Sequence, residues 1–219
     1  MTSPIRVLLV DDQELIRLGF RLVLDAEDDI DVVGEAADGE EALRAVRALT
    51  PDVILMDVRM PRVDGITATA RIVAEYPTSR ILVLTTFDLD EYAFGALQAG
   101  ASVFLLKDAQ RHELTAAVRA LHRGEAVLSA RITRQMLDRF AGSLPSSDPV
   151  DDPTTDLTER EREVFDAIAR GLTNAEIAAE FFVSESTVKT HVGRVLTKVG
   201  ARDRVHVVIL AHRLGIASP

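Results

Sequence analysis

The sequence contains no cysteine, and only three of its 25 basic residues are lysines, namely Lys107, Lys189 and Lys198. Without cysteine the chain can form neither a disulfide bond nor a thiolate zinc site, which is compatible with a reducing compartment. No apolar run approaches the roughly 18 residues that a membrane-spanning helix needs, and the amino terminus does not resemble a secretory signal. We therefore expect a cytoplasmic protein that has no membrane partner.

Acidic residues outnumber basic residues by 35 to 25, and the excess is uneven along the chain. Residues 1–124 carry 13 basic and 21 acidic side chains, a net charge of −8, whereas residues 154–219 carry nine of each. The overall net charge of −10 argues against nonspecific nucleic-acid binding by the whole molecule. It does not exclude DNA binding by a locally basic helix in the neutral part.

Short apolar runs and helical patterns alternate five times within residues 1–124. Strands are expected at 5–10, 30–33, 53–56, 80–85 and 102–106, and a helical pattern follows each of them. The first helical pattern carries Leu15, Leu18, Leu22 and Val23 on one stripe. This alternation with short connections predicts a doubly wound α/β fold, in which helices cover both faces of a five-stranded parallel sheet.

The rest of the chain divides into a linker and a helical region. Residues 142–155 hold three prolines, three serines and three aspartates with little apolar content, which predicts a flexible linker. Before it, residues 129–141 could form a helix, because Ile132, Met136 and Phe140 recur at four-residue spacing. The predicted organisation is a domain at 1–124, a linker at 125–155 and an all-α domain of four short helices at 156–219.

Polar side chains stand at the carboxyl ends of four predicted strands: Asp11 and Asp12, Asp57, Thr85, and Lys107. Parallel strands align these ends along one edge, so we expect the side chains to converge. Alone, each has an ordinary interpretation, such as a helix-capping acid or a solvent-facing lysine. Together, three carboxylates would repel one another without a hard cation, and oxygen ligands suit Mg²⁺. A phosphoryl group on Asp57 would be neutralised by the metal, the Lys107 ammonium and the Thr85 hydroxyl.

With Pro61 after Asp57 and Phe104 three residues before Lys107, residues 1–124 resemble the receiver domain of two-component response regulators. The resemblance implies that a cognate sensor histidine kinase phosphorylates Asp57. It implies a magnesium site formed by Asp11, Asp12, Asp57 and the backbone carbonyl of Arg59. It also implies that the phosphate-contacting and switch residues are Thr85, Thr86, Lys107 and Phe104. A plain core role is the alternative for the Phe104 ring.

In the helical region, a short helix and a turn precede a long helix predicted at about 185–199. Val188, Val192, Val195 and Val199 form one stripe of the long helix, as expected for a face packed on a core. The opposite face is small, polar and basic and contains no acid, which suits a DNA major groove. A solvated face of an ordinary bundle is the alternative. A glycine inside a helix, such as Gly193, lowers helix stability by about 1 kcal/mol relative to alanine. Close approach of a duplex would explain its presence, and so would sequence drift at a solvated site.

Residues 157–214 resemble the four-helix DNA-binding domain of quorum-sensing and nitrate-type regulators, the LuxR and NarL/FixJ type. The matching residues are Leu-Thr-Glu-Arg-Glu at 157–161, Gly171, Asn174, Ile177-Ala178 and the run at 183–192. The residues expected to bind DNA are Ser186, Thr187, Lys189, Thr190, Gly193, Arg194 and Lys198. This sequence departs from the family pattern at Gly193, where a basic side chain is missing.

The last predicted helix, at about 204–214, is apolar nearly all round. One face can pack on its own domain, and the surplus requires another partner. A second copy of the helix would give an isologous dimer that matches a two-fold DNA site. The predicted dimer contacts are Val205, Val208, Ala211 and His212.

These features predict a two-component response regulator, not an enzyme. Phosphorylation at Asp57 would control dimerisation and sequence-specific binding to a double-stranded promoter with two half-sites. The homodimer would form when the protein is phosphorylated. An enzymatic alternative is a small Mg²⁺-dependent phosphatase that uses Asp57 as its nucleophile. A degenerate receiver that dimerises without phosphate is a third possibility, and the complete Asp/Asp/Asp/Thr/Lys set argues against it.

Overall fold

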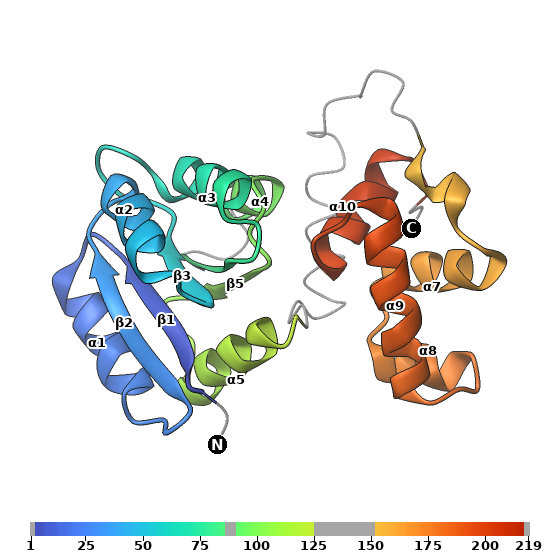
Figure 1. The fold of residues 1–219 in the computed structure, drawn as a ribbon, viewed down its shortest axis with the longest axis horizontal. Coiled ribbons are helices and arrows are strands. Elements are labelled where there is room, and N and C mark those ends of the chain that lie inside the picture. The colour runs from blue at the N-terminus through green and yellow to red at the C-terminus, as the bar shows by residue number, and fades with distance from the viewer. Residues whose placement is uncertain (1–2, 86–90, 125–151, 217–219) are drawn as a thin grey trace. The chain divides into compact units, whose positions relative to one another are not determined.

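The computed structural model describes residues 3–85, 91–124 and 152–216, and these form two compact units that divide near residue 127 (Figure 1). Each unit has its own hydrophobic core. The helix predicted at 129–141 and most of the predicted linker lie outside the described residues. None of the helices within the described ranges is long and apolar enough to cross a bilayer.

The first unit is built on a five-stranded parallel sheet. Its strands are β1 (Ile5–Val10), β2 (Ile30–Ala36), β3 (Val53–Asp57), β4 (Arg80–Thr85) and β5 (Val103–Leu106), in the order β2-β1-β3-β4-β5. β1, β3 and β4 are central and almost wholly buried, which explains their nearly uninterrupted apolar sequences. The predicted fold class is confirmed. β2 is longer than predicted because it continues to Ala36.

Helices cover both faces of the sheet (Figure 1). They are α1 (Glu14–Leu24), α2 (Gly39–Leu49), α3 (Gly65–Glu75), α4 (Glu91–Gln98) and α5 (Arg111–His122). α1 and α5 contribute Leu24, Leu114 and Val118 to the core on one face. α2, α3 and α4 lie on the other face (Figure 1). Asp38 caps the amino terminus of α2 by accepting a hydrogen bond from the Glu41 amide, so α2 begins at Gly39.

The leucine stripe of α1 faces solvent and not the sheet. Leu15 is 81% exposed, Leu18 49% and Leu22 65%, whereas Leu24 is fully buried and Phe20 packs against the core. Helix α1 has apolar residues around most of its circumference, so the sequence pattern allows either of two apolar faces to pack against the sheet. The exposed leucine stripe, defined here as Leu15, Leu18 and Leu22, is therefore an unpaired surface of the first unit.

The second unit is helical: η1 (Pro153–Asp156, a 3-10 turn), α7 (Glu159–Ala169), α8 (Asn174–Glu180), α9 (Glu185–Val199) and α10 (Arg204–Arg213). α7 to α10 all supply core residues, among them Phe165, Ile177, Val195 and Val207. A side-chain oxygen caps each helix, from Thr158, Thr173, Ser184 and Asp203 respectively. η1 is joined to α7 by Arg162, which donates to Thr154, so ordered structure extends into the last residues of the predicted linker.

Candidate functional site

Three acidic side chains gather at the carboxyl edge of the sheet, as the strand order requires. Asp57 ends β3, and Asp11 follows Val10 at the end of the neighbouring β1. Asp11 and Asp57 are buried, and Asp12 is exposed. One carboxylate oxygen from each of the three lies within 4.8 Å of the others. This acidic pocket, Asp11, Asp12 and Asp57, therefore presents oxygen donors from two adjacent strand ends.

Lys107 lies between the two buried carboxylates. Its Nζ is 2.7 Å from Asp11 Oδ2 and 3.0 Å from Asp57 Oδ2, and its side chain is itself buried. The backbone amide of Lys107 donates to the Thr85 carbonyl at 2.8 Å, which fixes the residue beyond the end of β5. Burial raises the pKa of Asp57 above its usual value, while the Lys107 ammonium opposes that rise. The lysine is therefore the main countercharge of the pocket.

Thr85 and Phe104 occupy the neighbouring strands. Thr85 is buried at the end of β4, and Phe104 is buried in β5, where it pairs with Val83. The structure thus places Thr85 and Lys107 on adjacent strand ends beside the acidic pocket. Phe104 occupies a core position, and its rotation as a switch stays a prediction. Thr86 lies outside the described residues.

The loop after Asp57 is held tightly against the strand end. A Cβ at Gly65 would overlap the backbone carbonyl of Asp57, and the Gly65 amide donates to the Val58 carbonyl at 2.9 Å. The backbone amide of Arg59 forms a hydrogen bond that lowers the pKa of Asp57, so the loop also contacts the carboxylate. Glycine is required at position 65 because of this approach, whereas its sequence context indicated only a tight turn.

An ion pair that the sequence did not indicate fastens the same loop to α2. Arg62 contacts the buried Asp38 carboxylate and has a left-handed backbone, with φ of 64°. The Gly39 amide adds a hydrogen bond to the Val63 carbonyl at 3.1 Å. An Asp-Gly pair in a sequence indicates a helix start or a turn, and the spacing from Asp38 to Arg62 does not indicate the contact.

In the second unit, α9 presents a polar face as predicted. Val188, Val195 and Val199 are buried in the core, and Val192 packs partly against it. The seven residues expected to bind DNA are all exposed: Ser186, Thr187, Lys189, Thr190, Gly193, Arg194 and Lys198. A Cβ at Gly193 would meet nothing within 4 Å, so the helix surface is open there. The arrangement can admit a close-fitting surface along the middle of the helix.

Lys198 has a structural role that the sequence analysis missed. Its Nζ lies 2.7 Å from Glu161 Oε2 and donates to the Asp156 carbonyl at 3.0 Å. The Glu161 carboxylate also accepts a hydrogen bond from the Thr158 amide at 2.9 Å. Together, the Lys198 ammonium and this hydrogen bond lower the pKa of Glu161 to about 2. The carboxyl-terminal end of α9 is therefore fastened to the start of α7. The charge of Lys198 is already partnered within the unit.

The predicted dimer contacts on α10 require a correction. Val205, Val208 and Ala211 are 4%, 3% and 0% exposed, and the last two belong to the core of their own unit. Side chains that are already packed there cannot also be covered by a second copy, so assigning these three to a dimer surface is wrong. His212 is only partly buried, and its role stays a prediction.

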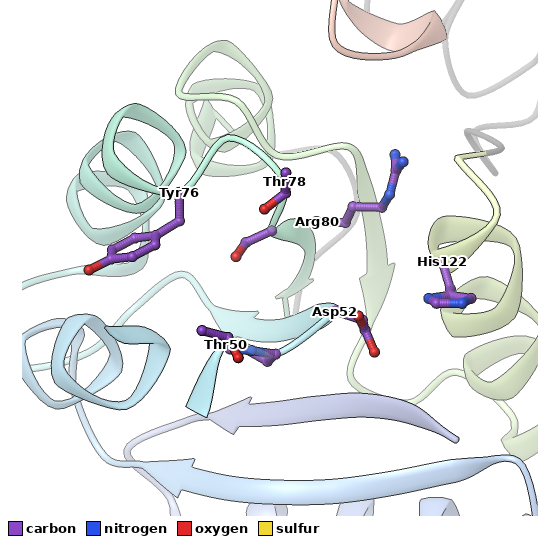
Figure 2. A pocket seen from close by; sticks show the side chains of 8 residues that line it. Thr50, Asp52, Tyr76, Thr78, Arg80 and His122 are labelled. Carbon is purple, nitrogen blue, oxygen red and sulfur yellow. The ribbon is translucent and has the colours of Figure 1, made fainter. Parts of the chain in front are cut away.

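A cavity of about 230 Å³ opens at the opposite edge of the sheet. Its lining comes from the segments that lead into β3 and β4 and from the end of α5, and Figure 2 shows Asp52 and His122 on facing sides. The Asp52 carboxylate accepts the Arg6 amide at 2.9 Å. None of the predicted site residues lines this cavity, so it is separate from the acidic pocket.

Comparisons with known proteins identify a family match for each of the two units. A model of the response regulator receiver domain matches residues 7–119, and a model of bacterial regulatory proteins of the luxR family matches residues 155–211. The chain is 45% identical over 216 residues to transcriptional regulatory protein YxjL of Bacillus subtilis (strain 168), and the alignment covers 98% of each. It is 42% identical over 209 residues to transcriptional regulatory protein LiaR of the same organism, covering 95% of this chain and 97% of LiaR. The crystal structure of response regulator ChrA, from a heme-sensing two-component system, matches with a TM-score of 0.54 and 35% identity, covering 98% of this chain and 100% of ChrA.

Proposed function

The chain belongs to the two-component response regulators that join a receiver domain to a LuxR-type DNA-binding domain, and from that premise we propose which residues carry its function. It regulates transcription, and phosphorylation controls that activity. We assign residues 1–124 to the receiver, 125–155 to the linker and 156–219 to the DNA-binding domain. The observation that carries the assignment of the phosphoacceptor is the buried Asp57 carboxylate beside Lys107.

Asp57 is the proposed nucleophile toward the phosphohistidine of a sensor histidine kinase. Its carboxylate oxygen forms the new P–O bond while the P–N bond to the kinase histidine breaks. The Lys107 ammonium and the Thr85 hydroxyl stand at neighbouring strand ends, where they would contact the transferred phosphoryl oxygens. The chemistry ends with phosphate on the protein's own side chain, so we propose no turnover of an external substrate.

The acidic pocket fits Mg²⁺. The three clustered carboxylate oxygens are hard donors, and the partly open position of Asp12 leaves room for water ligands. Asp11, Asp12, Asp57 and the Arg59 backbone carbonyl would hold the ion. When bound, it would neutralise charge on the phosphoryl group during transfer.

We place the kinase on the exposed leucine stripe. Helix α1 begins two residues after Asp12, so its first turn, which carries Leu15, follows directly from the acidic pocket. A kinase that delivers phosphate to Asp57 must cover this side of the receiver. Three exposed leucines on one helix supply the apolar contact area that a specific partner requires.

We propose that α9 enters the major groove of a promoter and that a dimer, formed on phosphorylation, occupies two half-sites. Ser186, Thr187, Lys189, Thr190 and Arg194 are the proposed contacts, with Gly193 allowing close approach. Lys198 could contact a DNA phosphate only if its ion pair with Glu161 broke, so we expect Lys198 to contribute little to DNA affinity. A DNA target places the working protein in the cytoplasm.

Labelling by a small phosphodonor tests the proposal for Asp57. Asp57→Asn in the full-length protein should abolish Mg²⁺-dependent labelling, because an amide oxygen is a poor nucleophile. Asp52→Asn is the matched control: it changes an acid at the opposite edge of the sheet and should label as the parent does. Removal of Mg²⁺ with a chelator should stop labelling of both the parent and the control. Labelling of the Asp57→Asn protein at the parental rate would refute the assignment.

A further inference from the structure

Phe182, in the turn between α8 and α9, combines two properties that phenylalanine ordinarily avoids. The residue is 95% exposed, more than any other large hydrophobic residue that the structure describes. Its backbone is left-handed, with φ of 54°. A left-handed backbone crowds the Cβ of a phenylalanine, and an exposed ring forfeits the benefit of burial. Glycine would remove both penalties, so the fold alone does not account for this side chain.

The turn holds the ring outward on a rigid base. On one side, the Phe181 amide donates to the Ile177 carbonyl at 2.9 Å, and the Arg160 guanidinium stacks 4.4 Å from the Phe181 ring centroid. On the other side, the Val183 amide donates to the Ala178 carbonyl at 3.0 Å, and the Val183 side chain packs against the core. Both neighbours are anchored, so the backbone at Phe182 is held in place and its side chain starts from a fixed point on the surface of the unit.

Phe182 lies next to the amino-terminal end of α9, which is the end expected to contact DNA bases. Ser184 caps that helix, and its hydroxyl lies 2.8 Å from the hydroxyls of Ser186 and Thr187, two of the proposed DNA contacts. Two peptide units separate Phe182 from Ser184, so their Cα atoms are at most about 8 Å apart. In helix-turn-helix proteins the first residues of the recognition helix contact base edges. A ring projecting beside them reaches the wall of the same groove.

We propose that Phe182 is a DNA-contact residue whose ring packs on deoxyribose and thymine methyl groups beside the first turn of α9. The ring and the Ser184–Thr187 hydroxyls then form one surface, apolar toward sugar and methyl groups and polar toward phosphates. The bound duplex covers the exposed ring, which explains why phenylalanine stands where glycine would be less strained. This inference rests on the proposed role of α9 and extends that interface into the preceding turn.

The experiment compares full-length, phosphorylated variants on a duplex selected with the parent protein. Phe182→Gly and Phe182→Asn both tolerate the left-handed backbone and should melt at or above the parental temperature. Their DNA affinity should fall roughly tenfold, the lower end of what burial of a phenylalanine contributes. The dependence of affinity on salt should not change, because an apolar contact releases no counterions. Phe182→Tyr, which keeps the ring, should retain most of the affinity.

Lys189→Ala is the matched control on the neighbouring helix, and it separates failure of this inference from failure of the proposed interface. It should weaken binding and reduce the slope of affinity against salt by about one. Parental affinity of the folded Phe182→Gly and Phe182→Asn proteins, with a weakened Lys189→Ala protein, overturns the role of Phe182 and leaves α9 as the DNA-binding helix. A loss of transcription by RNA polymerase without a loss of DNA affinity also overturns it, and assigns the ring to a protein contact. Parental affinity of all three variants overturns the α9 interface itself.

Discussion

Replacing Ala211 with aspartate should unfold the DNA-binding domain and not merely disturb an association. Ala211 lies in the last turn of α10 with no exposed surface, among core residues that include Val207 and Val208. Had α10 presented Ala211 to a second copy, the substitution would weaken DNA binding by a folded protein. The structure instead puts the new carboxyl inside the domain, where water cannot reach it.

The size of the effect follows from this burial. An aspartate with a usual pKa of about 3.9 can enter the core at pH 7 as the neutral acid, which costs about 4 kcal/mol. Leaving its polar atoms unpaired adds about 1–3 kcal/mol, and forcing extra atoms into a filled space adds about 1–3 kcal/mol. The described part of the domain, residues 152–216, should have a free energy of unfolding of roughly 3–10 kcal/mol. The penalty of roughly 6–10 kcal/mol is therefore as large as the middle to upper part of the range for the whole stability of the domain.

Thermal melting followed by far-UV circular dichroism measures the outcome. The Ala211→Asp protein should lose the helical signal and the melting transition of the second unit, while Asp57 in the separately packed receiver still accepts phosphate. Arg213→Asp introduces the same side chain two residues away on the exposed side of α10 and is the matched control. It should lower the free energy of unfolding by about 2 kcal/mol at most, because the reversal loses one favourable interaction with the helix dipole and adds one unfavourable interaction. An Ala211→Asp protein that melts like the parent but no longer associates would refute the reasoning and restore this helix face as a dimer surface.

Two further substitutions probe surfaces that the structure defines. Leu18→Asp, on the exposed leucine stripe, should slow phosphotransfer from the cognate kinase by roughly tenfold, the typical cost of a contact residue. Labelling by a small phosphodonor should not change, and slowed labelling would show damage to the receiver. The second concerns pH: because the folded pKa of Glu161 is about 2, below its usual value of 4.5, its contribution to stability is present above pH 4.5. It is lost as the pH falls from 4.5 toward 2, so Lys198→Met should flatten the dependence of melting temperature on pH in that window. An unchanged pH dependence in Lys198→Met would contradict the role of this ion pair.

The receiver pocket was predictable because, in a parallel sheet, the positions of the strands in the sequence determine which residues lie close together. Parallel strands align their carboxyl ends, so residues at those ends meet even when tens of residues separate them. Asp11, Asp57 and Lys107 illustrate this, since their buried contacts of 2.7 and 3.0 Å join three different strand ends. No knowledge of side-chain packing was needed, only the positions of strands in the chain.

The helical surfaces were harder to predict, because an apolar pattern does not say which face is covered. Helix α1 exposes leucines to solvent. Helix α10 buries Val208 and Ala211, which the sequence pattern had suggested were not needed for the core of their own domain. In both helices, apolar residues surround most of the circumference, so several orientations bury similar areas and the neighbouring elements decide among them. Periodicity succeeds on α9, where one face is valine-rich and the other contains no such residue, and fails where this contrast is missing.

Contacts between distant side chains outside the aligned strand ends could not be predicted from the sequence. Lys198 and Glu161 are 37 residues apart, and neither the position of the lysine on a basic face nor that of the glutamate in a capping box indicates the pair. The consequence for function is specific. The carboxyl-terminal end of α9 is fastened within the domain, whereas Phe182 in the preceding turn and Ser186, Thr187, Lys189 and Thr190 in the amino-terminal half of α9 are exposed. DNA recognition should therefore concentrate at the amino-terminal half of the helix, where the polar face is exposed and the preceding turn lies next to the first residues of the helix.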